Sequence, residues 1–200
     1  MSISQHPFIS SLLESSNLEE FASRALFTRT PHVFDADDAG YLGWRHSAAS
    51  LLGADALNVF IVGSGATGVS LNPRKHFRQF GPHSDIDVAV ISPWHFDTAW
   101  RSIRRQPTHS LSKTKKQAIS KHESHHVYWG TITTDSILAL LPFAKEWLHA
   151  RSKMQNEPPT EDRDIRFRLY RDIDSLRIYQ VRSLATARTE LAKTSGSLPK

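Results

Sequence analysis

The chain has 200 residues, of which 39% are hydrophobic and 22% charged, and its formal net charge at pH 7 is +5. This composition is typical of a globular protein with one domain, or with one domain and a helical appendage. The chain has no cysteine, which excludes disulfides, thiol catalysis and cysteine-ligated zinc. It also has no apolar run of membrane-spanning length and no signal-peptide pattern. We therefore expect a cytoplasmic protein that does not contact membranes.

The positive charge is concentrated in the last two thirds of the chain. Residues 1–60 contain three Lys or Arg against seven Asp or Glu, whereas the remainder contains 22 against 13. The net charge of this second part is therefore +9. A basic region of this kind suits a polyanionic ligand.

Two helices are predicted within residues 1–57, which we expect to pack as an N-terminal layer on the core. Ser16 and Glu19 form a capping-box pattern, and apolar residues at helical spacing extend this first helix to residue 28. The second helix is predicted over residues 35–52, with acidic residues in its first turn. We expect both helices to cover one face of the sheet that follows.

The next segment predicts a buried strand that ends in a tight turn. Val59 to Val62 is a short apolar run, as a buried strand requires. Gly63, Ser64 and Gly65 follow, and glycine lets a ligand approach the backbone amides closely. An ordinary loop is the alternative. A dinucleotide-binding turn also fits the glycine spacing through Gly68, but the proline-containing basic segment after it argues against the helix that such a site needs.

Two carboxylates, Asp85 and Asp87, open a second predicted strand. Because side chains alternate along a strand, both lie on one face, while Ile86, Val88 and Val90 take the other. Two carboxylates on one face repel each other unless a cation lies between them. A hard divalent cation such as Mg²⁺, held by carboxylates and substrate phosphates, meets this need. The alternative is that Asp85 caps a local turn.

These residues resemble the signature of the DNA polymerase β-like nucleotidyltransferase superfamily, which is an apolar strand, Gly-Ser, a spacer and then Asp-x-Asp on the next strand. Gly63-Ser64 and Asp85-Ile86-Asp87 match it, and the resemblance covers about residues 59–91. The spacer is longer than in compact members and has the composition of an inserted loop instead of their short helix. The resemblance implies an α/β fold in which helices flank a small mixed β-sheet.

The same resemblance implies a chemistry. Asp85 and Asp87 would be the catalytic residues and would bind Mg²⁺ or Mn²⁺ in two-metal fashion. Gly63, Ser64 and Gly65 would cradle the β- and γ-phosphates of a nucleoside triphosphate. The acceptor hydroxyl would belong to RNA, another nucleotide or a protein.

Two basic segments have both a functional and a plain interpretation. Arg74 and Lys75 lie in the spacer and would contact the triphosphate, or belong to a solvated loop. Residues 101–121 contain seven Lys or Arg and no acid. They form a solvated face or contact the phosphates of a nucleic acid, in which case binding weakens with salt.

Active members of the superfamily usually carry a third acid on a later strand. Here the predicted third strand, residues 125–134, is rich in aromatic and β-branched residues but contains no acid. Asp135 directly after it is the candidate third metal ligand, and a helix N-cap is the competing interpretation. Glu123 is the weaker candidate. The three histidines of residues 122–126 lack the spacing of a zinc motif.

The remaining predicted elements are helical. Helices are predicted over residues 96–105 and after Asp135, where Pro142 must kink or restart the helix. Residues 58–152 would thus form the nucleotidyltransferase core. Residues 160–192 are predicted to be one long C-terminal helix, because apolar residues recur every three to four positions. We expect part of this helix to lie against a partner protein.

The sequence therefore predicts a metal-dependent nucleotidyltransferase that moves a nucleotide from an NTP to a hydroxyl acceptor. Two alternatives stay open. One is a catalytically inactive module of a defence or toxin–antitoxin system that keeps the fold and binds a nucleotide or a partner. The other is an RNA-binding module that uses the basic stretches and is indifferent to Asp85 and Asp87.

Overall fold

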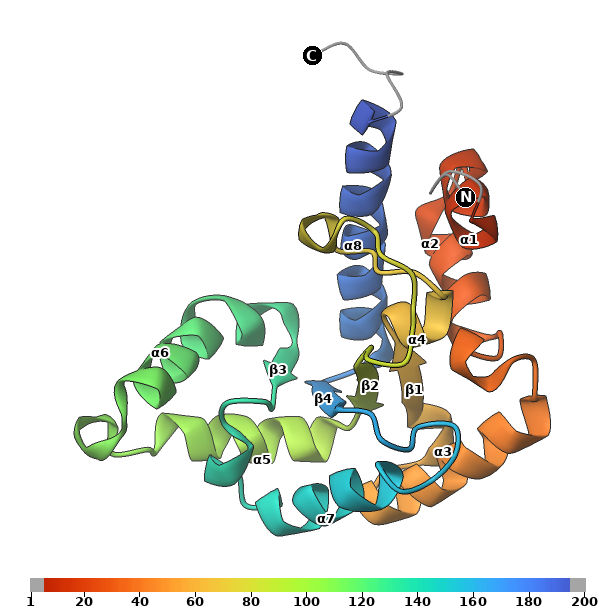
Figure 1. Cartoon of the computed structure of the whole chain (residues 1–200). Helices are drawn as coiled ribbons and strands as arrows, with labels where there is room; N and C mark the ends of the chain where they lie inside the picture. The colour runs from red at the N-terminus through yellow and green to blue at the C-terminus, as the bar shows by residue number, and fades with distance from the viewer. Residues whose placement is uncertain (1–5, 195–200) are drawn as a thin grey trace.

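A four-stranded mixed sheet lies at the centre of the computed structural model, which describes residues 6–194 (Figure 1). The strand order is β1-β2-β4-β3, where β1 is Val59–Val62, β2 is Ile86–Ile91, β4 is Ile165–Tyr170 and β3 is Thr131–Thr133. β1 pairs antiparallel with β2, β2 pairs parallel with β4, and β4 pairs antiparallel with β3. The predicted α/β fold with a small mixed sheet is confirmed.

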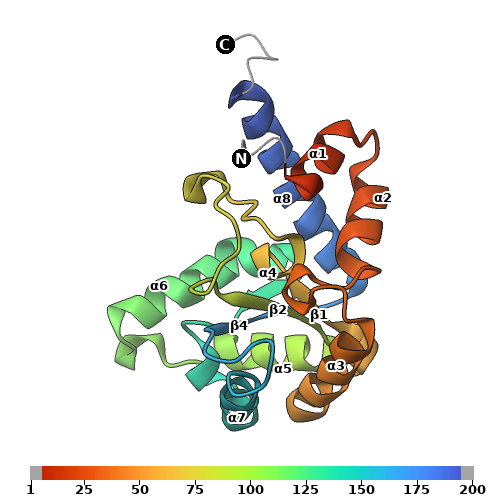
Figure 2. The same ribbon diagram turned by 45° about the vertical axis from the view of Figure 1, so that its right-hand side comes forward.

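Three helices cover one face of the sheet (Figure 2): α3 (Asp38–Leu52), α5 (Pro93–Arg104) and α7 (Ala144–Met154). The main hydrophobic core lies between them and the sheet, and it contains Val88 of β2 and the fully buried Trp147 of α7. The alternate residues of β2 that were predicted to be apolar therefore face this core, which leaves the opposite face to the two aspartates. The helices predicted over 35–52 and 96–105 are confirmed, with starts shifted by three residues.

The C-terminal helix α8 (Ile173–Thr194) covers the opposite face (Figure 1). Its first turns pack on the sheet through Leu176. Its second half extends beyond the sheet and packs, through residues such as Leu184, against α1 (Pro7–Glu14) and α2 (Leu18–Ala22). The predicted long C-terminal helix is thus present, and the N-terminal helices bury part of its apolar stripe.

The start of the long helix was predicted wrongly. It begins at Ile173 instead of residue 160, because residues 165–170 form β4. Within β4, three apolar side chains are buried in alternation with the half-buried Arg166 and Arg168. This period of two favours a strand over a helix, and it places both arginines on the face of the sheet that carries the aspartates.

The predicted third strand, residues 125–134, is correct only for β3 at residues 131–133. The residues before β3 continue the helix α6 (Lys113–Lys121) through a π turn. The buried ring of His122 explains this arrangement. Its Nδ1 donates to a helix carbonyl at 2.6 Å, and its Nε2 accepts the Thr133 backbone N–H at 3.1 Å. One histidine thereby joins the helix end to the strand.

The first N-terminal helix also differs from the prediction. Asn17, not Ser16, caps α2, and its side chain accepts the backbone N–H groups of Glu19 and Glu20. The expectation that both N-terminal helices cover one face of the sheet is wrong. α3 lies on the core face, whereas α2 packs against α8 on the other side (Figure 2).

Asp135 does not cap a helix. It lies in an exposed turn after β3, and the helix α7 begins only at Ala144, beyond Pro142. The restart at the proline was predicted correctly. Short helical turns connect the longer elements: Ser23–Phe27, His32–Phe34, Ala56–Asn58, Pro73–Lys75, Thr108–Ser110, His122–His126, Val127–Trp129 and Leu138–Leu140. Among the described residues, none of the helices combines the length and apolar character that a membrane span requires.

Candidate functional site

The site is organised around a glycine turn after β1. Gly63 has φ +64° and ψ −150°, a conformation that essentially only glycine adopts. A Cβ atom at Gly63 would lie 2.6 Å from Oδ2 of Asp87, so the turn and the carboxylate are in direct contact. The four-residue helix α4 (Ser64–Thr67) follows. The expectation of a loop without the short helix is therefore wrong at this point.

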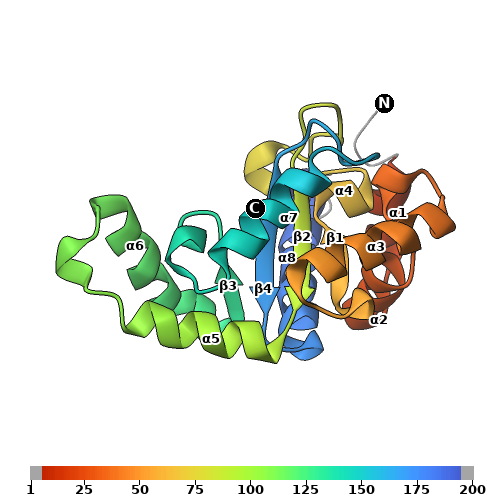
Figure 3. The same cartoon turned by 90° about the horizontal axis from the view of Figure 1, so that it is seen from below.

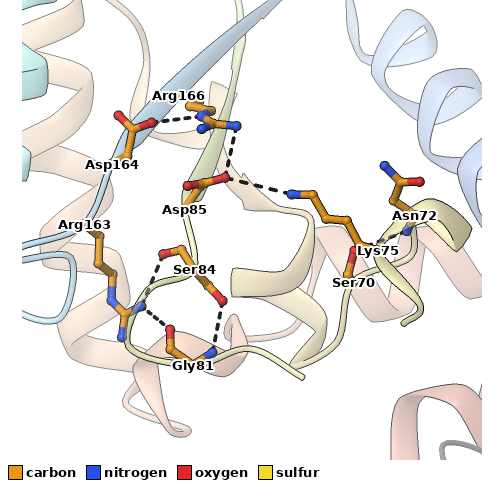
Figure 4. Close-up of polar contacts among 9 residues, drawn as sticks. All are labelled: Ser70, Asn72, Lys75, Gly81, Ser84, Asp85, Arg163, Asp164 and Arg166. Carbon is orange, nitrogen blue, oxygen red and sulfur yellow. Dashed lines mark hydrogen bonds and ion pairs between the residues drawn. The ribbon is translucent and has the colours of Figure 1, made fainter. Parts of the chain in front are cut away.

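Asp85 is neutralised by two cationic side chains (Figure 4). Its Oδ2 lies 3.0 Å from Nη1 of Arg166 and 3.9 Å from Nζ of Lys75. Arg166 also holds Asp164, at 2.9 Å. The turn that precedes Asp85 is held separately, because Arg163 donates to the carbonyl oxygens of residues 81, 82 and 84. The interpretation of Asp85 as a simple turn cap is therefore not supported, since its carboxylate engages in ion pairs.

Asp87 lies deeper than Asp85. Burial raises the pKa of Asp87, and the charges of Arg168 and then Arg166 oppose that shift. The negative charge of Asp85 acts in the same direction as burial and also raises the pKa of Asp87. A desolvated carboxylate of this kind is stabilised by a cation close to it.

The strand next to the aspartates, β4, carries two arginines and no acid. In the pairing of β2 with β4, Asp87 lies opposite Arg166 and Ala89 opposite Arg168. Asp135 is exposed in its turn, and its charge acts on Arg166, while Glu123 is exposed in the π turn. Neither acid lines the cavity that Asp87 faces.

A cavity of about 600 Å³ lies beside the glycine turn. It is lined by Gly63, Ser64 and Asp87, by the spacer, by the segment from the end of α6 to β3, and by residues 178–186 of α8. Four cationic side chains line it: Lys75, Lys121, Arg168 and Arg182. Among the described residues that line it, Asp87 is the one carboxylate. The cavity is thus strongly positive and suits a polyanion.

Aromatic rings hold two of these cations in place. The guanidinium of Arg182 lies 3.9 Å from the ring centre of Trp129, and that of Arg168 lies 4.5 Å from the ring of Tyr179. Such contacts orient a guanidinium while its N–H groups stay available to a ligand. The buried Tyr170 hydroxyl also lines the cavity and completes no hydrogen bond of ordinary geometry within the described residues, although Gln180 lies close to it.

Burial lowers the pKa of two histidines at or beside the cavity, His126 and His122. His125 and His126 line it. Burial, followed by the charges of His122 and Arg168, lowers the pKa of His126 to about 4. Burial also lowers the pKa of His122, which agrees with the hydrogen bonds that fix its ring. His126 therefore adds a hydrogen-bonding group, and not charge, to the cavity near pH 7.

Several of the residues predicted from the sequence meet here. Gly63, Ser64, Lys75 and Asp87 line the cavity, and Asp85 reaches it through its ion pair with Lys75. By contrast, Gly65 is buried against β1 and β2, and Arg74 is exposed outside the cavity. Sequence reasoning missed Arg168, Arg182, Trp129 and Tyr179, and it singled out Lys121 only as part of the basic segment 101–121. The seven arginines between residues 163 and 188 were the available signal, but they were assigned to one helix.

Asp85 and Asp87 are the candidate metal ligands at this site. Asp85 and Asp87 could hold one Mg²⁺ together with substrate phosphates, as Mg²⁺ is commonly held. Among the described residues, no group of three His, Cys, Asp or Glu is arranged to hold a metal by itself. A bound nucleotide would therefore have to supply the remaining ligands.

Comparisons with known proteins add no relative. The chain matches no protein-family model, no curated protein and no solved structure. The resemblance to the nucleotidyltransferase superfamily stays a prediction that rests on the residues themselves.

Proposed function

We propose that the chain binds a nucleoside triphosphate in this cavity and transfers its nucleotide to a hydroxyl acceptor. The observation that carries the proposal is the meeting of the Gly63–Ser64 turn and Asp87 with four cationic side chains in one cavity. Backbone amides, Lys and Arg are the groups that bind phosphate oxygens. The volume of about 600 Å³ lies in the range of roughly 300–1,000 Å³ that is typical of ligand pockets.

Within this proposal each group has a role. Lys75 and Arg168 hold phosphate oxygens, and the fixed guanidinium of Arg168 does so next to Asp87. Ser64 and the backbone of the turn contact the terminal phosphates. The aromatic side of the cavity, with Trp129 and Tyr179, offers flat surfaces on which a base can stack.

A single Mg²⁺ or Mn²⁺ would be held by Asp85, Asp87 and the phosphates. When bound, such an ion neutralises phosphate charge and lowers the pKa of an attacking hydroxyl. Arg166 and Lys75 now neutralise Asp85 and would compete with the ion. We therefore expect measurable metal binding only when the nucleotide is present.

A second candidate function is nucleotide binding without transfer. The observation that favours it is Arg168, a cation on the strand beside the two aspartates, which carries no acid. A cation there strengthens the binding of a triphosphate but cannot accept a proton from a hydroxyl, because arginine stays charged. In this case the chain would bind the nucleotide without transferring it, and the nucleotide-bound protein would be the functional form.

The deciding experiment incubates the protein with each labelled NTP, Mg²⁺ or Mn²⁺, and cellular RNA or lysate, and asks what becomes labelled. Asp87→Asn and Asp85→Asn should lower transfer by about 100-fold, which corresponds to the few kcal/mol of charge stabilisation that a metal supplies. Full transfer by both variants would contradict the proposal. Nucleotide binding with no transfer under any condition selects the second candidate.

A further inference from the structure

The helix α6 presents a row of cations that have no acidic partner. Lys113, Lys116 and Lys121 are all exposed on this helix, whereas Ile119 is buried. Positions three or four apart share a helix face, so Lys113 and Lys116 lie on one face, and Lys121 follows at the C-terminal end of the helix. These three lysines are called the ridge below. Between Arg101 and Lys121 the chain contains no acid. Among the described residues, Arg101 is the member of this segment that forms an ion pair with a carboxylate.

Some other cations of the protein, unlike this ridge, are neutralised by acids. Within the described residues, arginines such as Arg166, Arg171 and Arg177 each pair with a nearby aspartate. Solvated basic residues are often interleaved with acids that neutralise them. A basic run without such acids keeps its full positive electrostatic potential. The charge of α6 is therefore available to an external polyanion.

The ridge leads into the cavity of the candidate site. α6 projects from the body of the molecule (Figure 3), and its C-terminal end lies beside β3. Lys121, at that end, lines the cavity. The helix rises by about 1.5 Å per residue, so the lysines extend over roughly 12 Å from its outer end to the cavity.

Two aromatic residues mark the point where the ridge meets the cavity. The Tyr128 side chain is 79% exposed, which is unusual for so large a ring. It lies edge-on to Trp129, with 5.0 Å between ring centres, and Trp129 lines the cavity. A cationic track that ends at exposed aromatic rings is the arrangement by which proteins bind single-stranded nucleic acids.

We infer that α6 and Tyr128 bind a single-stranded RNA and direct its 3′ end into the cavity. The inference rests on the proposed function, because it identifies the RNA terminus as the hydroxyl acceptor. The phosphates would lie along Lys113 and Lys116, and a base near the terminus would stack on Tyr128. A terminal ribose carries two adjacent hydroxyl groups, which the polar side chains of the cavity, such as Thr131 and Gln180, can contact.

The test measures the binding of a fluorescent single-stranded RNA by anisotropy at several salt concentrations. The variant is K113Q/K116Q, and the matched control is K145Q/K153Q, which removes two exposed lysines of α7. Each lost phosphate contact should lower the slope of log affinity against log salt by about 0.7 for a single strand. We expect a slope smaller by about 1.4, and an affinity about 25-fold weaker at 0.1 M salt if the lines meet at 1 M. The control should bind like the wild type.

A second variant tests the stacking contact. Tyr128→Ala should weaken RNA binding by about tenfold without changing the salt slope, while Tyr128→Phe should keep the affinity because it keeps the ring. If K113Q/K116Q binds RNA with unchanged slope, or if a DNA strand of the same sequence binds as well as RNA, the inference is overturned.

The outcomes separate this inference from the proposed function. Lys113 and Lys116 do not line the cavity, so their replacement should leave NTP binding unchanged, which also reports that the variant is folded. If RNA binds as predicted but the protein binds no NTP, the RNA-binding surface on α6 is supported and only the proposed function is refuted. Normal NTP binding with no RNA binding by the wild type would refute the inference alone.

Discussion

Gly63 offers the sharpest test of the geometry at the site, through the substitution Gly63→Ala. The residue has φ +64° and ψ −150°, where a side chain costs about 1–3 kcal/mol of backbone strain. In addition, the new Cβ would lie 2.6 Å from the Asp87 carboxylate, which must move although it is largely buried. We expect the free energy of unfolding to fall by about 2–4 kcal/mol.

Thermal unfolding measures this loss. For a chain of this size, each 1 kcal/mol shifts the Tm by roughly 2–4 °C, so Gly63→Ala should lower it by roughly 4–16 °C. The matched control is Gly43→Ala in α3, where a Cβ meets no atom within 4 Å. This substitution should stabilise the helix by about 0.5–1 kcal/mol. A Gly63→Ala protein with wild-type Tm and wild-type NTP binding would refute the contact between the turn and Asp87.

Three further predictions concern other parts of the chain. Arg163→Ala should lower the free energy of unfolding by about 2 kcal/mol in urea, because the guanidinium donates to three backbone carbonyls of residues 81–84; an unchanged midpoint would contradict this. The pKa of His126 falls from an ordinary 6.5 to about 4 on folding, so the unfolded chain binds the proton first and stability must decrease as the pH falls from 6.5 to 4. Screening at this half-exposed ring limits the loss to about 1 kcal/mol. When the free energy of unfolding in urea is measured at pH 6.5 and at pH 4, His126→Gln should therefore lose about 1 kcal/mol less than the wild type. Asp135→Asn should leave both Tm and transfer unchanged, since this exposed carboxylate neither caps a helix nor lines the cavity; loss of transfer with an intact fold would identify it as a metal ligand.

Local patterns predicted the first half of the sheet well. The run at residues 59–62, the glycine turn and the alternation after Asp85 each involve neighbours in sequence, and β1 and β2 form where expected. The alternation also placed Asp85 and Asp87 opposite the apolar core. Such features are decided by backbone conformation and side-chain period, which a sequence displays directly.

The second half of the sheet could not be predicted in this way. In residues 165–173 the apolar positions 165, 169 and 173 fit a helical spacing, whereas 165, 167 and 169 fit a strand. The parallel pairing of β4 with β2 decides the matter, and that pairing joins residues about 80 positions apart. Since no local pattern reports such a contact, the strand was missed.

The site was predicted in part for the same reason. Gly63, Ser64, Asp85 and Asp87 belong to one continuous motif and were found. Lys121, Arg168 and Arg182 reach the cavity from a helix end, a strand and the C-terminal helix. Their convergence depends on the strand order, with β4 inserted between β2 and β3. The strand beside the two aspartates therefore proved to be basic, and the predicted third acid, Asp135, lies in an exposed turn outside the cavity.

The most direct test of the central claim is a calorimetric titration of the protein with each non-hydrolysable NTP in the presence of Mg²⁺. One NTP should bind at a single site. Arg168→Gln and Lys75→Gln should each weaken it by about 10–100-fold, as the loss of a charged hydrogen bond predicts. Arg74→Gln, at the neighbouring residue outside the cavity, should bind like the wild type. If no NTP binds, or if all three variants bind as tightly as the wild type, the cavity is not a nucleotide site.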